Sequence, residues 1–170
     1  MLKIINYLEP FFEDNYRRVG VREYARIRKI SPPSASKLLS ELKKEDLLKM
    51  EEDRRHHLYN ANIKNELFII LSGIYWSDKL KKSGMVEYIN ETFLEPVIIL
   101  FGSFSKAEVN KNSDIDIAII RKGARKHYDL YSYEKKLKRK IHSFDFRDLG
   151  EIPKNLVGGI LSGYVISGTW

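Results

Sequence analysis

Two aspartates, Asp114 and Asp116, lie inside the otherwise apolar stretch SDIDIAII. Side chains two positions apart on a strand point to the same face, so these carboxylates would project together, with Ile115 and Ile117 on the opposite face. An ionised carboxylate beside apolar neighbours is costly unless it is paired or binds a metal, and two adjacent like charges increase that cost. The spacing therefore predicts a site for Mg²⁺ or Mn²⁺, since such ions combine a few carboxylates with water and substrate phosphates.

A glycine–serine step upstream predicts where phosphates would bind. Gly102 and Ser103 follow the apolar run VIILF and open a short helix. Glycine lets the backbone approach a ligand closely, and the N–H groups at a helix start can hold an anion together with the Ser103 hydroxyl. A loop of about ten residues then leads to the aspartates. The order of these parts predicts a phosphate-binding turn followed by a strand with paired carboxylates.

A third acid, Asp145, lies between Phe144 and Phe146 in a later strand-like run. If that run pairs beside the aspartate strand, Asp145 would face the same cluster. Three acids could hold two metal ions, one activating the attacking hydroxyl and the other holding the triphosphate. Asp145 could also take the proton of that hydroxyl. Asp148 is the alternative if the strand register is shifted, but the alternation of side chains favours Asp145.

The elements that must position these acids form a small α/β unit. The run KNELFIILSGIYW is apolar at helical spacing and predicts a linker helix, which we place at residues 63–76. Beyond it we expect a domain over 77–170: an amphipathic helix (77–93), the strand PVIILF buried on both faces, the strand SDIDIAII, a basic helix (128–139), the strand KIHSFDFRDL, and a last helix from Pro153 that contains GGILSG.

The stretch GSFSKAEVNKNSDIDIAII with the later FDF resembles the nucleotidyltransferase superfamily that includes DNA polymerase beta, and in particular its small, stand-alone minimal nucleotidyltransferases. The resemblance covers about residues 80–168. It implies phosphate contacts from Gly102 and Ser103 and metal binding by Asp114, Asp116 and Asp145. Many members carry Arg-Gly a few residues after Gly-Ser; this chain has Lys106-Ala107, so Lys106 is our further nucleotide-binding candidate. The final LSGYVISG resembles the C-terminal helix of small members.

The first half predicts a different kind of module. A helix ends near Phe12, a second covers 21–29, ISPPS forms a break with Ser31 as N-cap, and a third helix runs to about Lys44. Two short strands at 47–51 and 56–60 then flank a charged tip. This order resembles a winged helix-turn-helix domain over residues 1–62. Such domains often have glycine where this chain has Asp46, and aspartate tolerates the left-handed conformation needed there.

The winged-helix resemblance implies DNA contacts from the start of the third helix and from the hairpin tip. The candidates share a polar or basic, outward-facing side chain: Ser31, Ser34, Ser36, Lys37, Arg54 and Arg55. The alternative is a winged domain that serves protein contacts or dimerisation. His56 and His57 are adjacent in a strand and point to opposite faces, which disfavours a metal site there.

Composition sets outer bounds on these predictions. The chain has 170 residues, a net charge of +7 and no cysteine, which excludes disulfides and thiolate chemistry. The positive charge favours polyanionic partners only weakly, and basic stretches such as RKGARK and KKLKRK are consistent with solvated surfaces. No apolar run reaches the roughly 18 residues of a membrane span, and the start does not read as a signal peptide, so we expect a cytoplasmic protein without a membrane partner.

The sequence as a whole predicts an α/β (α+β) protein of two modules: a DNA-binding winged helix-turn-helix, acting as a homodimer, and a small mixed-sheet nucleotidyltransferase. The second would transfer NMP, with ATP as the expected donor, to a hydroxyl of a protein such as a partner toxin or of a small molecule. The alternative is a transcriptional regulator whose nucleotidyltransferase fold only senses a nucleotide or mediates dimerisation.

Overall fold

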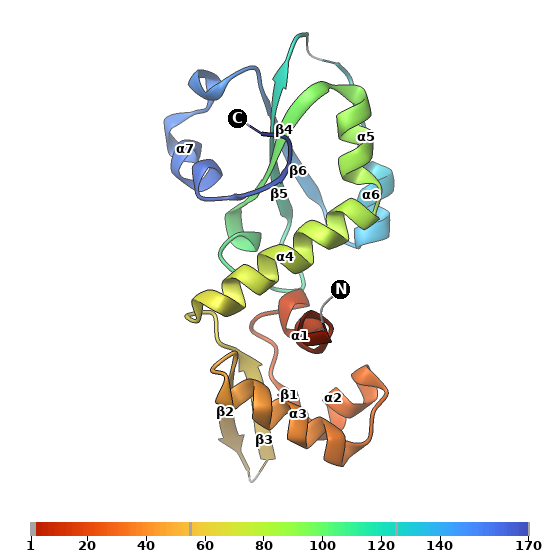
Figure 1. The fold of residues 1–170 in the computed structure, drawn as a ribbon, viewed down its shortest axis with the longest axis vertical. Helices are drawn as coiled ribbons and strands as arrows, with labels where there is room; N and C mark the ends of the chain where they lie inside the picture. The colour runs from red at the N-terminus through yellow and green to blue at the C-terminus, as the bar shows by residue number, and fades with distance from the viewer. Residues whose placement is uncertain (1–2, 55, 125, 170) are drawn as a thin grey trace. The chain divides into compact units, whose positions relative to one another are not determined.

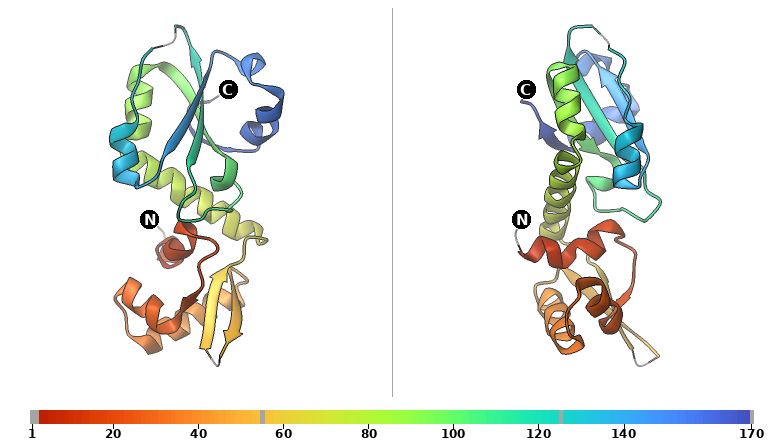
Figure 2. Two further views of the ribbon diagram at one scale, coloured as in Figure 1. Left: turned by 180° about the vertical axis from the view of Figure 1, so that it is seen from behind. Right: turned by 90° about the vertical axis from the view of Figure 1, so that its right-hand side faces the viewer.

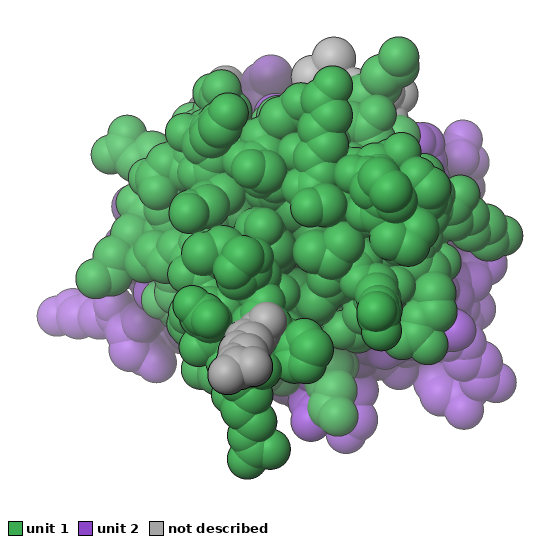
Figure 3. Space-filling view, turned by 90° about the horizontal axis from the view of Figure 1, so that it is seen from below, with its two compact units in different colours: residues 1–72, 107–111 green, residues 73–106, 112–170 purple. Residues whose placement is uncertain are grey.

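The computed structural model describes residues 3–54, 56–124 and 126–169, and the chain divides into two compact units. Unit 1 comprises Met1–Ser72 with Ala107–Lys111, and unit 2 comprises Gly73–Lys106 with Asn112–Trp170. Figure 3 colours the two units separately. The boundary between the two units, after Ser72, lies within a helix and inside the region 63–76 that was predicted as a linker. Residues 107–111 belong to unit 1 although the chain on both sides of them belongs to unit 2.

Unit 1 contains helices followed by a hairpin, in the predicted order (Figure 1). Its elements are α1 (Lys3–Glu13), β1 (Val19–Gly20), α2 (Val21–Arg28), α3 (Pro32–Lys44), β2 (Leu48–Asp53) and β3 (His56–Ala61). The sheet order is β1-β3-β2, with both pairings antiparallel. The short strand β1 was not predicted; its two residues are recognisable only through their pairing with Tyr59 and Leu58.

The turn between α2 and α3 follows from its local sequence. Lys29 adopts a left-handed conformation (φ 53°) and ends α2. Ser31 then caps α3, because its hydroxyl accepts a hydrogen bond from the Ser34 N–H at 3.3 Å, as predicted. Pro32 and Pro33 occupy the first turn, where a missing N–H costs nothing. Asp46 is left-handed (φ 56°), which matches its predicted tolerance of that conformation.

The core of unit 1 is aromatic and aliphatic. Helix α1 buries Leu8, Phe11 and Phe12 completely, and α3 buries Leu39. The ring of Phe12 packs on that of Phe68 with centroids 5.1 Å apart. These contacts explain why the helical spacing of the apolar residues in this half predicted its helices.

The break between the two helices predicted at 63–76 and 77–93 lies several residues later than predicted. Helix α4 (Glu66–Lys82) is longer than the predicted linker, and α5 (Met85–Thr92) follows it. Gly84 separates them with a φ of +86°, and the Ser83 hydroxyl donates to the Leu80 carbonyl at 2.7 Å. The prediction was wrong here because the apolar spacing continues across a glycine whose left-handed conformation ends one helix and starts another.

The sheet of unit 2 has the order β6-β5-β4-β7. Its strands are β4 (Leu94–Phe101), β5 (Ile115–Lys122), β6 (Ile141–Phe146) and β7 (Tyr164–Ser167), and the remaining helices are α6 (Tyr131–Leu137) and α7 (Lys154–Leu161). β5 pairs parallel with β6, and β4 pairs antiparallel with β5 and β7, so the sheet is mixed. Helix α7 covers one face and α5 and α6 the other (Figures 1 and 2).

The C-terminal segment corrects another prediction. Instead of continuing as a helix, LSGYVISG leaves α7 at Leu161, turns, and forms the strand β7 along β4. Gly163 permits this, since a Cβ there would meet the Leu100 carbonyl oxygen at 2.6 Å. Within the described part of the chain, no helix has both the length and the apolarity needed to cross a bilayer.

Candidate active site

Gly102 and Asp116 lie against each other at the end of the central strand pair. Phe101, the last residue of β4, is in register with Asp116 on β5. Gly102 follows with a φ of +70° and begins a 3₁₀ turn, η1 (Gly102–Phe104). A Cβ at this position would collide with the Asp116 carboxylate. Glycine is therefore required here for two reasons: the left-handed backbone and the close approach of a carboxylate.

Asp114 and Asp116 share one cluster with a histidine. The parallel register of β5 and β6 places His142 beside Asp116. Its Nδ1 lies 3.4 Å from Asp116 Oδ1, and its Nε2 lies 3.8 Å from Asp114 Oδ2. The side chains of the two aspartates are 39% and 27% exposed, so both can reach a ligand. Asp116 therefore lies against both Gly102 and His142, and His142 also faces Asp114; the metal-binding and catalytic roles of the two aspartates stay predictions.

His142 was missed from the sequence. The alternation of β6 puts it on one face with Phe144 and Phe146, and the register with β5 makes that face the one carrying Asp116. The only signal in the sequence was a polar residue two positions before an aromatic strand segment. That signal is not distinctive without the register.

The electrostatics of the cluster favour a cation. Burial raises the pKa of Asp116 above its ordinary value; His142 opposes this through its charge and hydrogen bond, and the neighbouring charge of Asp114 adds to it. A carboxylate whose ionised form is disfavoured in this way gains most from a positive ligand.

Asp145 does not join the cluster, and its predicted role as a third site carboxylate is wrong in geometry. It is in register with Ile119, on the opposite face of the sheet from Asp116 and His142. Its side chain is 1% exposed and accepts a hydrogen bond from Arg121 Nε at 2.5 Å. Arg121, itself 6% exposed, also donates to the Gly123 carbonyl. Asp145 thus compensates a buried arginine.

The donors present can hold a metal ion, but not as a closed protein cage. Among the described residues, no set of three histidine, aspartate or glutamate side chains is arranged as a preformed metal site. Asp114 and Asp116 supply two oxygen ligands, and Mg²⁺ commonly completes its shell with water and substrate phosphates. The residues are therefore compatible with a metal that arrives with its triphosphate.

The remaining nucleotide-binding candidates lie in the turn after Gly102. The side chain of Ser103 is half-buried and Lys106 is exposed. The Ser105 hydroxyl donates to the Gly102 carbonyl at 3.0 Å, and the Lys106 N–H donates to the Ser103 carbonyl at 3.3 Å. These bonds hold the turn compactly next to the aspartates. The phosphate contacts of Ser103 and Lys106 stay predictions.

The candidate DNA-binding residues belong to unit 1, whereas the aspartate cluster belongs to unit 2. Those at the start of α3, namely Ser31, Ser34, Ser36 and Lys37, are all exposed, as is Arg54 at the hairpin tip. The hydroxyls of Ser31 and Ser34 hydrogen-bond to each other at 2.8 Å, so these two also serve the helix start. Arg55 lies outside the described residues, and the DNA contacts stay predictions.

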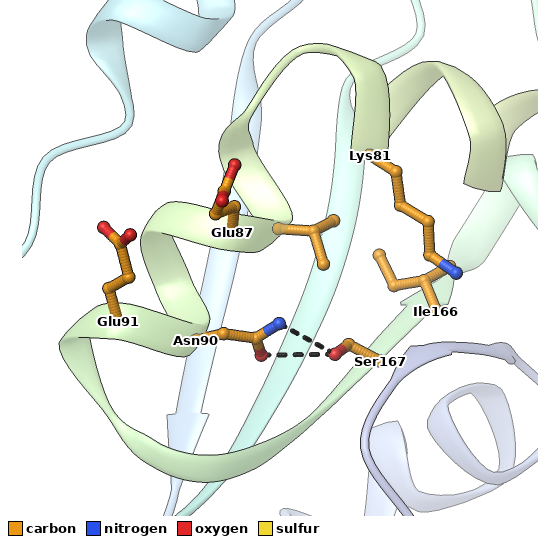
Figure 4. Close-up of a pocket in the computed structure, with 7 residues that line it drawn as sticks. Lys81, Glu87, Asn90, Glu91, Ile166 and Ser167 are labelled. Atoms are coloured by element: carbon orange, nitrogen blue, oxygen red, sulfur yellow. Dashed lines mark hydrogen bonds between the residues drawn. The ribbon is translucent and has the colours of Figure 1, made fainter.

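A shallow pocket of about 580 Å³ lies elsewhere in unit 2, between the end of α4, α5 and β7 (Figure 4). Lys81, Glu87 and Glu91 lie on its rim, and Asn90 hydrogen-bonds to Ser167 across it at 3.0 Å. The described residues that line it include neither aspartate of the cluster. This pocket is therefore distinct from the aspartate cluster.

Comparison with known proteins agrees with the geometry of unit 2. The family model described as "Polymerase beta, Nucleotidyltransferase" matches residues 87–168, a span that contains the Gly-Ser turn, both aspartates and His142. No curated protein matches the chain. The family match supports placing residues 87–168 in the nucleotidyltransferase superfamily.

Proposed function

We propose that unit 2 binds a nucleoside triphosphate, with ATP as donor, and transfers its NMP group to a hydroxyl. The observation that carries this proposal is the close approach of the Gly102 backbone to the Asp116 carboxylate, inside a segment that matches the nucleotidyltransferase family. Phosphoryl transfer depends on positioning the phosphate groups and on stabilising their negative charge. A phosphate-binding turn and paired carboxylates that hold a metal ion, at one point of the sheet, would meet both needs.

Each residue of the cluster has a proposed task. Asp114 and Asp116 hold Mg²⁺ or Mn²⁺, which when bound supplies charge neutralisation at the triphosphate. The backbone at Gly102 and the hydroxyl of Ser103 contact phosphate oxygens, and Lys106 adds positive charge beside them. His142, which lies where a third acid was expected, accepts a hydrogen bond from the incoming hydroxyl. His142 takes the hydroxyl proton, the acceptor oxygen bonds to the α-phosphorus, and the bond between the α-phosphorus and the bridging oxygen of the pyrophosphate breaks, so that pyrophosphate leaves.

We further propose that unit 1 is a winged helix-turn-helix that binds DNA as a homodimer. The support is the succession of α2, a tight turn, the capped α3 and the β2–β3 hairpin, with exposed polar residues at the start of α3. In such a domain Ser34 and Lys37 would contact bases or phosphates, and Arg54 the backbone next to the hairpin. A protein acceptor, such as a partner toxin modified on tyrosine or serine, would make the whole chain a regulatory transferase.

A label-transfer experiment tests the transferase. The full chain is incubated with ATP labelled on the α-phosphate, with Mg²⁺ or Mn²⁺, and with candidate acceptor proteins; nucleotide binding is followed by calorimetry. The matched control is the double variant Asp114→Asn/Asp116→Asn, which keeps side-chain size and removes both charges. We expect metal-dependent binding and transfer in the wild type and neither in the control. Absence of both from the wild type would eliminate the proposal.

The placement of Asp145 favours a second candidate function. With that carboxylate committed to Arg121, the cluster holds two acids, and a site of this kind could bind a nucleotide without turning it over. In this reading the fold senses a nucleotide and regulates DNA binding. Two measurements distinguish the candidate functions. A sensor would bind nucleotide in the presence of metal without transferring NMP to any hydroxyl, and its affinity for DNA would change when ATP is added.

A further inference from the structure

Asn15, just after α1, is a buried polar residue whose hydrogen bonds reach a distant part of the chain. It is 1% exposed. Its backbone N–H donates to the Val109 carbonyl at 2.7 Å, and its side-chain Oδ1 accepts from the Val109 N–H at 2.6 Å. Its Nδ2 donates to the Phe11 carbonyl at 2.7 Å. Asn15 therefore pairs with both backbone groups of Val109, as a neighbouring strand would.

The segment held by Asn15 is anchored by apolar contacts as well. Ala107 and Val109 are both completely buried, and residues 107–111 belong to unit 1. Ala107 has a φ of +53°, a conformation that a non-glycine residue adopts only where its surroundings hold it there. The segment is thus part of the folded body of unit 1, although the residues before and after it belong to unit 2.

This anchored segment is the middle of the loop that joins the two halves of the candidate site. Val109 follows Ser103 by six residues and precedes Asp114 by five. A stretch of five or six residues spans at most about 20 Å, so an anchor at its end restricts where the rest of the stretch can go. Fixing the middle of the loop therefore restricts the conformations of both the Gly-Ser turn and the aspartate pair.

We propose that Asn15 is a positioning residue for the nucleotide site, and that through it unit 1 controls nucleotide binding by unit 2. This inference rests on the proposed function of unit 2. An amide is costly to bury, and a small apolar residue would fill the site at lower cost if packing were the only need. What the asparagine side chain adds is an acceptor for the backbone N–H of Val109, a residue of one loop 94 positions away.

The test uses three variants of the full chain. Asn15→Ala removes both side-chain hydrogen bonds and leaves the buried Val109 N–H without this acceptor. Asn15→Ser is the conservative variant, because its hydroxyl keeps an uncharged oxygen for the Val109 N–H, whereas an aspartate would bury a charge against the Phe11 carbonyl oxygen. Tyr16→Ala is the matched control, since the next residue is 56% exposed and its side chain is outside this arrangement.

The first readout needs no ligand. Hydrogen exchange is measured at the Val109 amide and in residues 102–106 and 112–116. We expect Asn15→Ala to speed exchange at Val109 and in both flanking segments, Asn15→Ser to do so less, and Tyr16→Ala not at all. Faster exchange at Val109 with wild-type exchange in both flanking segments would overturn the coupling. If Asn15→Ala does not fold, the same comparison is made with Asn15→Ser.

The second readout is the Kd for a fluorescent ATP analogue with Mg²⁺ or Mn²⁺. We expect Asn15→Ala to raise the Kd about 5- to 150-fold, the usual range for coupling between two sites, and Asn15→Ser to raise it less. An unchanged Kd in a folded Asn15→Ala protein contradicts the proposed control. If the wild type binds no nucleotide, the proposed function of unit 2 fails, and the exchange measurement still decides whether Asn15 governs the loop.

Discussion

Replacing Asp145 by alanine distinguishes a structural carboxylate from a catalytic one. Asp145 and Arg121 form a pair whose side chains are 1% and 6% exposed. Without the carboxylate, Arg121 retains its bond to the Gly123 carbonyl and its position 5.9 Å from the ring centre of Phe93. Neither carries a negative charge, so the buried guanidinium loses the carboxylate to which it is hydrogen-bonded.

The expected loss is large. Removing one partner of a buried ion pair costs about 3–5 kcal/mol. For a chain of this length each kcal/mol corresponds to roughly 2–4 °C in Tm, so Asp145→Ala should lower the Tm by roughly 10 °C. Replacing both partners by apolar residues, Arg121→Met with Asp145→Leu, should restore most of the loss, since an apolar pair of similar volume is often as stable as a buried ion pair.

The fluorescence of Trp76 can report on this unfolding. Its indole is completely buried in unit 2 and packs edge-on against Phe104, with ring centroids 4.6 Å apart. A Trp170→Phe background removes the other tryptophan signal of the chain. Urea and thermal unfolding are then compared among wild type, Asp145→Ala and the apolar double variant, alongside nucleotide binding by calorimetry at a temperature where all are folded.

One pattern of results would refute the reasoning. If Asp145→Ala stays within about 0.5 kcal/mol of the wild type, the range of an ordinary surface substitution, but loses nucleotide binding, then Asp145 belongs to the site and the face assigned to it here is wrong. Conversely, a stable apolar double variant that still binds nucleotide shows that the site works without a carboxylate at position 145.

Three further predictions follow from other residues. Gly102→Ala should abolish measurable nucleotide binding in calorimetry, because its methyl group collides with Asp116. Gly158→Ala in α7, where nothing surrounds the added methyl group, should raise the free energy of unfolding in urea by about 0.5–1 kcal/mol. If the two variants bind nucleotide equally well and are equally stable, the steric role given to Gly102 is contradicted. Burial raises the pKa of Tyr24 to about 12, so between pH 10 and 12 the unfolded chain loses this proton before the folded one, and stability falls as pH rises through that window. Tyr24→Phe should remove that part of the fall in urea titrations, and an identical pH profile would count against the buried phenol. Lys37→Ala should weaken DNA binding and reduce the slope of log K against log salt by about 0.9 if it contacts one phosphate; an unchanged slope excludes that contact.

Much of the local structure of this protein follows from sequence patterns only a few residues long. The two-residue spacing of Asp114 and Asp116 put both carboxylates on one face, and the glycine before Ser103 marked a turn that a side chain would block. The cap at Ser31 and the apolar spacing of the helices likewise depend on neighbours a few residues away. Such features are readable from sequence because their physical causes, side-chain period, capping and backbone sterics, act over less than one helical turn.

Other features depended on which segments meet in space. Alternation on β6 shows that residues 142, 144 and 146 share a face, but only pairing with β5 decides whether that face or the other joins Asp116. Arg121 lies on the apolar face of β5 with Ile117 and Ile119, and its position in the sequence could have indicated the role of Asp145. A buried guanidinium requires a carboxylate from a neighbouring strand, and Asp145 supplies it. The pairing of Asn15 with Val109 spans 94 positions, and no local pattern encodes it. Strand register and long-range hydrogen bonds are settled by the packing of the whole unit, so only the tertiary structure could assign these residues to their faces and partners.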